Sequence, residues 1–162
     1  MCRYKNLFNC SAIRSFVYQT GMPELPLYEF DEADIELSLL PMAARRALDC
    51  AGLHLSLKGW QQLSLGQRQA LVRAGAPERV DVQRVVQLLA AASAHIRPTA
   101  QLTEAEALDE TLLEALPAGH SLDQAGWRRL SALDRYVLAQ LARRGKRERL
   151  AIAYQEICGV LP

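Results

Sequence analysis

The sequence lacks the long apolar runs and the charge imbalance that mark membrane proteins and nucleic-acid-binding proteins. Half of its 162 residues are hydrophobic, but the longest stretch of apolar character, residues 85–96, is interrupted by Gln87, Ser93 and His95. It therefore falls short of the roughly 20 apolar residues that a membrane-spanning helix requires. The formal net charge of +1 provides no broad positive field for nucleic acid. We expect one globular domain with neither a membrane nor a nucleic-acid partner.

Cysteine pairs and metal-ligand spacings are also missing. There is no Cys-x-x-Cys motif, and Cys50 and His54 stand four residues apart with Gly52 between them. The other histidines, His95 and His120, fall on separate predicted elements, whereas a structural zinc site needs four convergent ligands. We expect a reduced, cytoplasmic protein with no metal site and no cofactor.

The common catalytic signatures are absent as well. The sequence has no Gly-x-Ser-x-Gly, Gly-x-Gly-x-x-Gly, phosphate-loop or His-Glu-x-x-His motif. We therefore expect no catalytic residue and no enzyme activity. The weakest hypothesis, an enzyme, would require an acid and a base such as Asp49 and His54 to converge in a pocket.

Residues 1–21 contain three basic residues and no acidic one, but no continuous apolar segment followed by a cleavage site. A secretory signal is therefore not predicted. A transit-like leader and a reading frame that starts too early are both left open, and we favour the second, with translation from Met22. The predicted domain spans residues 22–162.

The sequence does contain one pattern that it uses twice. Residues 60–71 align without a gap on residues 127–138 and share Trp, Leu, Ser, Arg and Leu at equal offsets. The two segments begin with Trp60 and Trp127, which are the only tryptophans, and Ser64 and Ser131 lie at equal positions within them. The pattern predicts an internal two-fold repeat in which both tryptophans are buried in one core.

Few aromatic residues, many leucines and regular capping signals favour a compact all-α fold of about seven short helices. Pro41 can open the first helix, and Gly52 can end it in the left-handed conformation. Ser56, Ser64 and Ser131 are predicted N-caps of later helices. The expected helices begin near residues 42, 57, 65, 82, 104, 122, 132 and 146, after an extended N-terminal arm.

Two arginines and one carboxylate stand out within this scheme. Asp49 lies near a helix C-terminus, where a carboxylate is disfavoured, and an ion pair with Arg45 or Arg46 is expected to compensate it. Arg68 and Arg135 occupy equivalent repeat positions and should be partly buried. We favour a structural role for both, by stacking on the repeat's tryptophan or by binding carbonyls at a helix end; the alternative is an anion-binding site.

Charge is uneven along the chain, since the arm is acidic and the C-terminal region is basic. The basic residues singled out as a possible docking surface are Arg143, Arg144, Arg147 and Arg149. Solvation and attraction to the acidic arm provide the simpler explanation.

Residues 40–45, Leu-Pro-Met-Ala-Ala-Arg, together with residues 55–60, Leu-Ser-Leu-Lys-Gly-Trp, carry a family resemblance. With Tyr-Glu-Phe-Asp at 28–31 and residues 127–141, they resemble the nitrate reductase-associated proteins. The resemblance implies an accessory factor rather than the reductase itself, and it provides no catalytic residue.

Two functional hypotheses follow. The first is an accessory or assembly factor that binds nitrate reductase or a molybdenum-cofactor protein. The second is a sensor of a small anion such as nitrate or nitrite, with Arg68 or Arg135 in its pocket.

Overall fold

The computed structural model describes residues 15–16, 24–90, 95–102 and 108–159. In this part the chain is mainly helical. The helices are α1 (Met42–Cys50), α2 (Leu57–Gln62), α3 (Leu65–Ala74), α4 (Val82–Leu89), α5 (Glu110–Ala115), α6 (Gln124–Arg129), α7 (Ala132–Arg143) and α8 (Arg147–Cys158), with a short 3-10 helix η1 (Glu29–Asp31). The strands β1 (Ser15–Phe16), β2 (Leu25–Pro26), β3 (Leu53–Leu55) and β4 (Ile96–Pro98) form two antiparallel pairs, β1 with β2 and β3 with β4.

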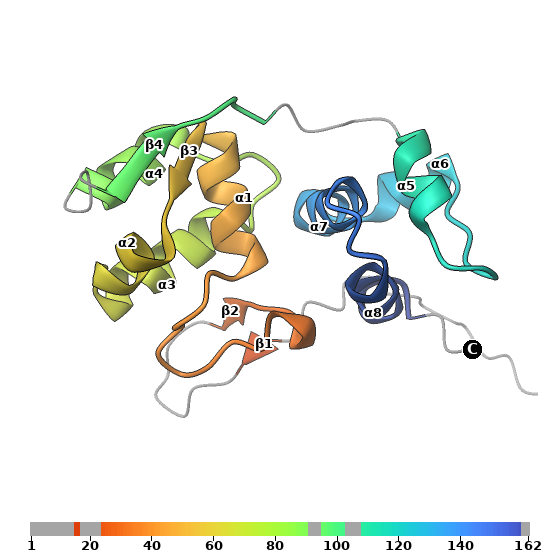
Figure 1. Ribbon diagram of the computed structural model, residues 1–162, viewed down its shortest axis with the longest axis horizontal. Coiled ribbons are helices and arrows are strands. Elements are labelled where there is room, and N and C mark those ends of the chain that lie inside the picture. Colours follow the sequence, from red (N-terminus) through yellow and green to blue (C-terminus); the bar gives the residue numbers. More distant parts are fainter. Residues whose placement is uncertain (1–14, 17–23, 91–94, 103–107, 160–162) are drawn as a thin grey trace, which may run out of the picture.

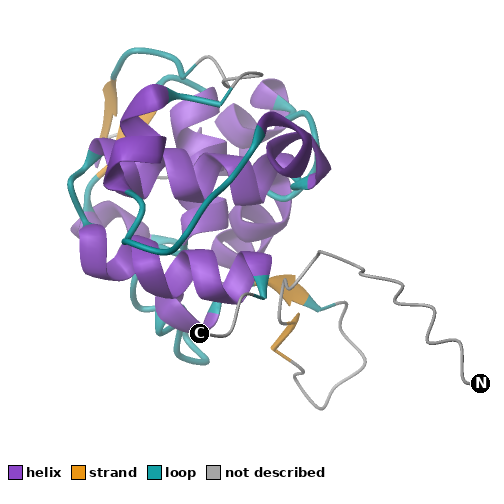
Figure 2. Ribbon diagram, turned by 90° about the vertical axis from the view of Figure 1, so that its right-hand side faces the viewer, coloured by secondary structure: helices purple, strands orange, loops and turns teal. Residues whose placement is uncertain are grey.

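The helices lie in two groups, which Figure 1 shows side by side, with α1 and α7 facing each other between them. Strands β3 and β4 lie with α1 to α4, whereas β1 and β2 lie beneath both groups. The view in Figure 2 shows the helices as one packed body, with the β1–β2 pair at its edge. No helix in the described part is long and apolar enough to cross a membrane.

The strands correct the prediction of an all-α fold. Residues 53–55, between the predicted helix starts near 42 and 57, form strand β3, which pairs with β4 through Leu55 and Ile96 in a two-stranded sheet. Helix α4 ends at Leu89, and residues 91–94 lie outside the described residues. The sheet joins segments that are distant in the sequence, so no local pattern predicted it. Strand β1 belongs to the segment that we left outside the fold, and the rest of residues 1–21 lies outside the described residues.

Most predicted helix ends are confirmed. The side chains of Ser56, Ser64 and Ser131 each accept a backbone N–H in the first turn of the helix that follows. The exception is α6, which was expected to begin near residue 122 but begins at Gln124, with Asp123 as its N-cap. The predicted start of a helix near residue 104 lies outside the described residues, and α5 begins at Glu110.

The two tryptophan motifs have the same local structure. Each forms a six-residue helix, a leucine with extended backbone, and a longer helix that opens with a serine capping box. Trp60 and Trp127 are 0% and 1% exposed, as predicted. The Trp60 Nε1–H donates to the Leu37 carbonyl at 2.6 Å, whereas the buried Trp127 Nε1 has no partner among the described residues. A two-fold relation between whole halves stays a prediction.

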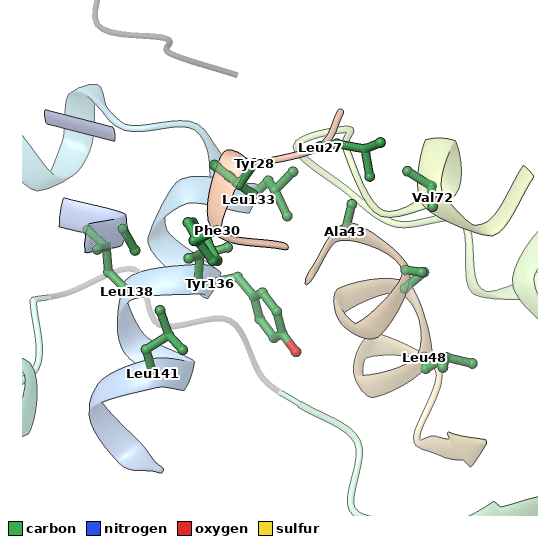
Figure 3. Packing of buried hydrophobic residues seen from close by; sticks show 14 of the residues in the cluster. Leu27, Tyr28, Phe30, Ala43, Leu48, Val72, Leu133, Tyr136, Leu138 and Leu141 are labelled. Carbon is green, nitrogen blue, oxygen red and sulfur yellow. The ribbon is translucent and has the colours of Figure 1, made fainter. Parts of the chain in front are cut away.

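Buried side chains from both groups of helices form one hydrophobic cluster. The arm supplies part of its centre, since Leu27, Tyr28 and Phe30 are all buried. Figure 3 shows Tyr28 and Phe30 beside α7 and Leu27 near Val72 of α3, with Tyr136 reaching from α7 toward α1. The Tyr28 hydroxyl donates to the buried Asp134 carboxylate at 2.7 Å, and burial together with this contact raises the Tyr28 pKa. The arm is therefore part of the core.

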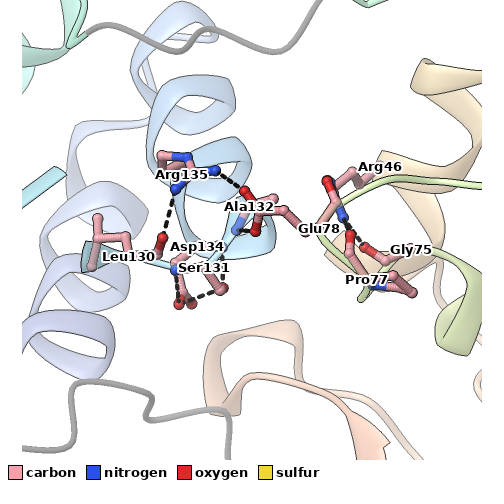
Figure 4. A network of polar contacts seen from close by, with 9 residues as sticks. All are labelled: Arg46, Gly75, Pro77, Glu78, Leu130, Ser131, Ala132, Asp134 and Arg135. Atoms are coloured by element: carbon pink, nitrogen blue, oxygen red, sulfur yellow. Dashed lines mark hydrogen bonds and ion pairs between the residues drawn. The ribbon is translucent and has the colours of Figure 1, made fainter. Parts of the chain in front are cut away.

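Helix α1 is fixed to the turn after α3 by a fully buried arginine. The Arg46 guanidinium donates to the carbonyls of Gly75, Pro77 and Glu78 at 2.5, 2.7 and 3.1 Å (Figure 4). A Cβ on Gly75 would lie 1.7 Å from the Ala43 carbonyl oxygen. The backbone of the turn therefore touches the backbone of α1, and only glycine allows this approach.

The same turn also holds α7. The Glu78 carboxylate accepts from the Ala132 backbone N–H, in the first turn of α7, and pairs with Arg135 (Figure 4). Although its burial favours the neutral acid, the hydrogen bond from Arg135 lowers the pKa of Glu78. One turn thus joins the two helix groups.

Replacing Gly75 with alanine should destabilise the protein by at least about 2 kcal/mol, because the new methyl group overlaps a backbone carbonyl that cannot move independently. Gly66 is the matched control, since a Cβ there meets nothing within 4 Å. Gly66→Ala should be neutral or stabilising by up to about 1 kcal/mol, because alanine is the better helix former. Urea unfolding of both variants tests the expectation, and equal stabilities would contradict it.

Candidate functional site

A cleft of about 520 Å³ lies where α1 begins and α7 ends. The arm, the β3–α2 connection and the start of α8 supply its other walls. This volume falls in the range of ordinary ligand-binding clefts. Four of the lining side chains are cationic, namely Arg45, Arg144, Lys146 and Arg149, and the apolar ones include Leu39, Leu57 and Trp60.

Contacts of Asp49 set how α1 and α7 meet. Its carboxylate accepts from the Tyr136 hydroxyl at 2.6 Å and from the Gln140 amide at 3.2 Å. Burial and the nearby Asp49 charge raise the Tyr136 pKa, so the phenol remains a donor. The hydrogen-bond partners of Asp49 thus come from α7. Of the two arginines expected to compensate Asp49, Arg46 binds the carbonyls of the turn after α3, and Arg45 lies close enough for the Asp49 charge to raise its pKa.

Arg45 and Arg144 flank this joint and line the cleft. Arg45 precedes Asp49 by four residues, and Arg144 follows Gln140 by four, so each stands about one helical turn, roughly 6 Å, beyond the joint. Arg45 is half-buried, and burial followed by repulsion from Arg144 lowers its pKa. In the described part of the chain, neither side chain has a hydrogen bond or ion pair.

A carboxylate that lines the same cleft is already bound. Asp31 accepts from the Met42 backbone N–H at 3.0 Å and from the Tyr28 N–H at 3.3 Å. Asp31 thereby provides an acceptor for the Met42 N–H in the first turn of α1. The N-cap residue, Pro41, has no side-chain acceptor that could do this. Burial raises the pKa of Asp31 to about 6, although both backbone hydrogen bonds act in the opposite direction.

Both repeated arginines have structural partners. Arg68 donates to the carbonyls of Trp60, Gln61 and Glu36 at 3.1, 2.6 and 2.6 Å, which joins the end of α2 to the arm. Arg135 donates to the Leu130 carbonyl at 2.7 Å and pairs with Glu78. These are the helix-end carbonyl contacts that we favoured over an anion site.

The structure divides the predicted basic surface. Arg144 and Arg149 line the cleft, whereas Arg143 does not, and Arg147 lines a separate hollow of about 180 Å³. A guanidinium nitrogen of Arg149 also lies 3.8 Å from a carboxylate oxygen of Glu32. Arg45 was predicted only as a structural residue, because its place in the cleft depends on the contact of α1 with α7, two helices that are distant in the sequence.

The structure does not bring the candidate metal ligands Cys50 and His54, or the candidate acid–base pair Asp49 and His54, into a recognisable site. Cys50 is buried while His54 is exposed, and the described residues contain no cluster of three metal-binding side chains. Asp49 is occupied by Tyr136 and Gln140.

Comparison with known proteins adds one finding. The sequence model of the conserved nitrate reductase-associated protein family matches residues 27–157. The chain belongs to this family. The match covers every residue that lines the cleft, as well as both tryptophan motifs. No curated protein and no solved structure matches the chain.

Asp31 should make stability depend on pH. Its pKa is higher in the folded protein than its ordinary value of 3.8, so its contribution is fully present below that value and is lost as the pH rises through about 6. Urea unfolding should therefore show wild type losing stability relative to Asp31→Asn over this interval. Asp34, whose pKa is lowered by bonds from Ser38, is the control with the opposite sign. A constant wild-type-to-Asp31→Asn difference across these pH values would contradict the expectation.

Arg144 should contribute nothing to stability. Replacing it with glutamine removes its repulsion with Arg45, so we expect the free energy of unfolding to stay within about 0.5 kcal/mol of wild type or to rise. Arg143→Gln controls for the favourable effect of a cation at the end of α7. A loss at Arg144 larger than that at Arg143 would show that the cleft arginine stabilises the fold.

Proposed function

We propose that this protein is a non-enzymatic accessory or assembly factor of nitrate assimilation. It binds nitrate reductase, or a protein that supplies the molybdenum cofactor, through the cleft between α1 and α7. The proposal places the protein in the cytoplasm. Family membership supplies the link to nitrate reductase.

The observation that carries the proposal is the pair Arg45 and Arg144. Two guanidinium groups line one cleft without an acceptor in the described part of the chain; burial and, second, repulsion from Arg144 lower the pKa of Arg45, while the charges of Asp49 and Asp31 partly offset this repulsion. An acidic group of a partner would relieve this repulsion and gain charge-assisted hydrogen bonds. Arginine is also common at the energetic centres of protein interfaces.

A non-enzymatic role is supported by how the groups with raised pKa are used. Asp31 binds two backbone amides, Tyr136 binds Asp49, and Tyr28 binds Asp134. Each of these contacts holds one element against another. None leaves a proton donor or acceptor directed at a substrate position.

The test is a pull-down with the full chain from nitrate-grown source cells. Wild type should recover nitrate reductase or a molybdenum-cofactor protein, and Arg45→Ala/Arg144→Ala should lose at least nine-tenths of it. The control Arg128→Ala/Arg129→Ala removes two exposed arginines of α6, outside the cleft, and should recover as much as wild type. Equal recovery by both variants would exclude the cleft as the docking site.

The same arginines favour a second candidate, a nitrate or nitrite sensor. A half-buried arginine opposite a second cation is a plausible anion site without any protein partner. Calorimetric titration of wild type with nitrate separates the two candidates. Saturable binding that the cleft variant loses, together with no recovered protein, would favour the sensor.

A further inference from the structure

We propose that two copies of this chain associate through the same cleft, each inserting residues 34–36 of its arm into the cleft of the other. The occupant is thus a second copy of the chain. This inference goes beyond the proposed function and does not depend on it, because it requires nothing except the protein itself.

The inserted segment is exposed, apolar at its centre and acidic at its sides. Ile35 is 58% exposed, and it lies between Asp34 and Glu36, which are also exposed. The Asp34 carboxylate accepts from the Ser38 backbone N–H at 2.7 Å. The Glu36 carboxylate has no hydrogen bond or ion pair in the described part of the chain. Glu36 therefore has a charge to offer to a partner.

The base of this segment is held firmly. Arg68 binds the Glu36 carbonyl at 2.6 Å, and Trp60 binds the Leu37 carbonyl at 2.6 Å. Leu37 is fully buried although its φ is +50°, a region that a branched side chain rarely occupies. These contacts fix the backbone beside the exposed Ile35, so little conformational entropy is lost when the segment binds.

The cleft has the complementary chemistry. Arg45 and Arg144 line it without acceptors, and at its edge Leu39 and Leu57 are 51% and 52% exposed. Glu36 of one copy can pair with Arg144 of the other. Ile35 then covers the two leucines, which removes apolar surface of both copies from water.

The position of the segment beside the cleft favours a closed pair. Leu39 lines the cleft and follows Glu36 by only three residues, so donor segment and acceptor cleft lie on one face. If two such faces meet across a two-fold axis, the segment of each copy enters the cleft of the other at the same time. A reciprocal contact of this kind stops at two copies and forms no filament.

The dimer would cover the surface that the proposed function assigns to a partner protein. A partner and a second copy would then compete for Arg45 and Arg144. The concentration of the protein would thus regulate how much of the cleft is open.

The experiment measures the molar mass of the full chain by light scattering over about a hundredfold range of concentration, wide enough to resolve a tenfold change in Kd. Wild type should pass from one chain to two as concentration rises. Arg144→Glu alone and Glu36→Arg alone should each stay monomeric, because both contacts in either homodimer then join like charges. An equimolar mixture should dimerise again, because each contact then joins opposite charges.

Matched variants test the apolar part and the position of the contact. Ile35→Ser should weaken dimerisation at least tenfold, whereas Ile152→Ser, at a site that is 51% exposed on α8, should leave it unchanged. Arg143→Glu, next to Arg144 but outside the cleft, should dimerise like wild type.

A wild type that stays monomeric throughout would overturn the proposal. So would a dimer that persists in Arg144→Glu, or a mixture of the two charge variants that fails to dimerise. The outcome is separate from that of the pull-down, because Glu36→Arg keeps the cleft intact. That variant should still recover nitrate reductase if the proposed function holds, whether or not the dimer exists.

Discussion

The fold depends on one buried cation that donates to the backbone oxygen atoms of a turn. Arg46 places its charge inside the protein, where an unpaired guanidinium would be very costly, and three carbonyls of a single turn compensate it. Those carbonyls are within reach only because Gly75 lets the turn touch α1. The same turn places the Glu78 carboxylate at the start of α7. A local arrangement of hydrogen bonds therefore sets the distance between the two groups of helices.

The next residue toward the N-terminus shows the opposite behaviour. Arg45 lines the cleft, where its charge meets a second cation, Arg144, and the more favourable charges of Asp49 and Asp31. In the described part of the chain it makes no hydrogen bond or ion pair, so Arg46 binds the turn while Arg45 remains available in the cleft. The Asp49 carboxylate forms hydrogen bonds with Tyr136 and Gln140, while its charge raises the Arg45 pKa.

Features set by neighbouring residues could be predicted from the sequence. The serine caps, the left-handed Gly52 just after α1, the burial of both tryptophans and the binding of helix-end carbonyls by Arg68 all follow from spacing between neighbouring residues. Features that join distant segments could not. The partner of Asp49 lies 87 residues away, and β3 pairs with β4 across 40 residues of other structure. The cleft belongs to the second kind, because no local pattern brings Arg45 beside Arg144.

The two tryptophans differ in a way that gives the protein a built-in probe. Trp60 lines the cleft and its indole N–H is bound to a carbonyl, whereas the indole N–H of Trp127 is buried in the described core without an acceptor. Hydrogen bonding lowers the stretching frequency of an indole N–H, so the two rings are distinguishable in one vibrational spectrum. A change in the hydrogen bond between Trp60 and the Leu37 carbonyl would alter the signal of the first ring and leave the second as an internal reference. The two copies of the motif thus provide one hydrogen-bonded indole and one unbonded indole for comparison within the same protein.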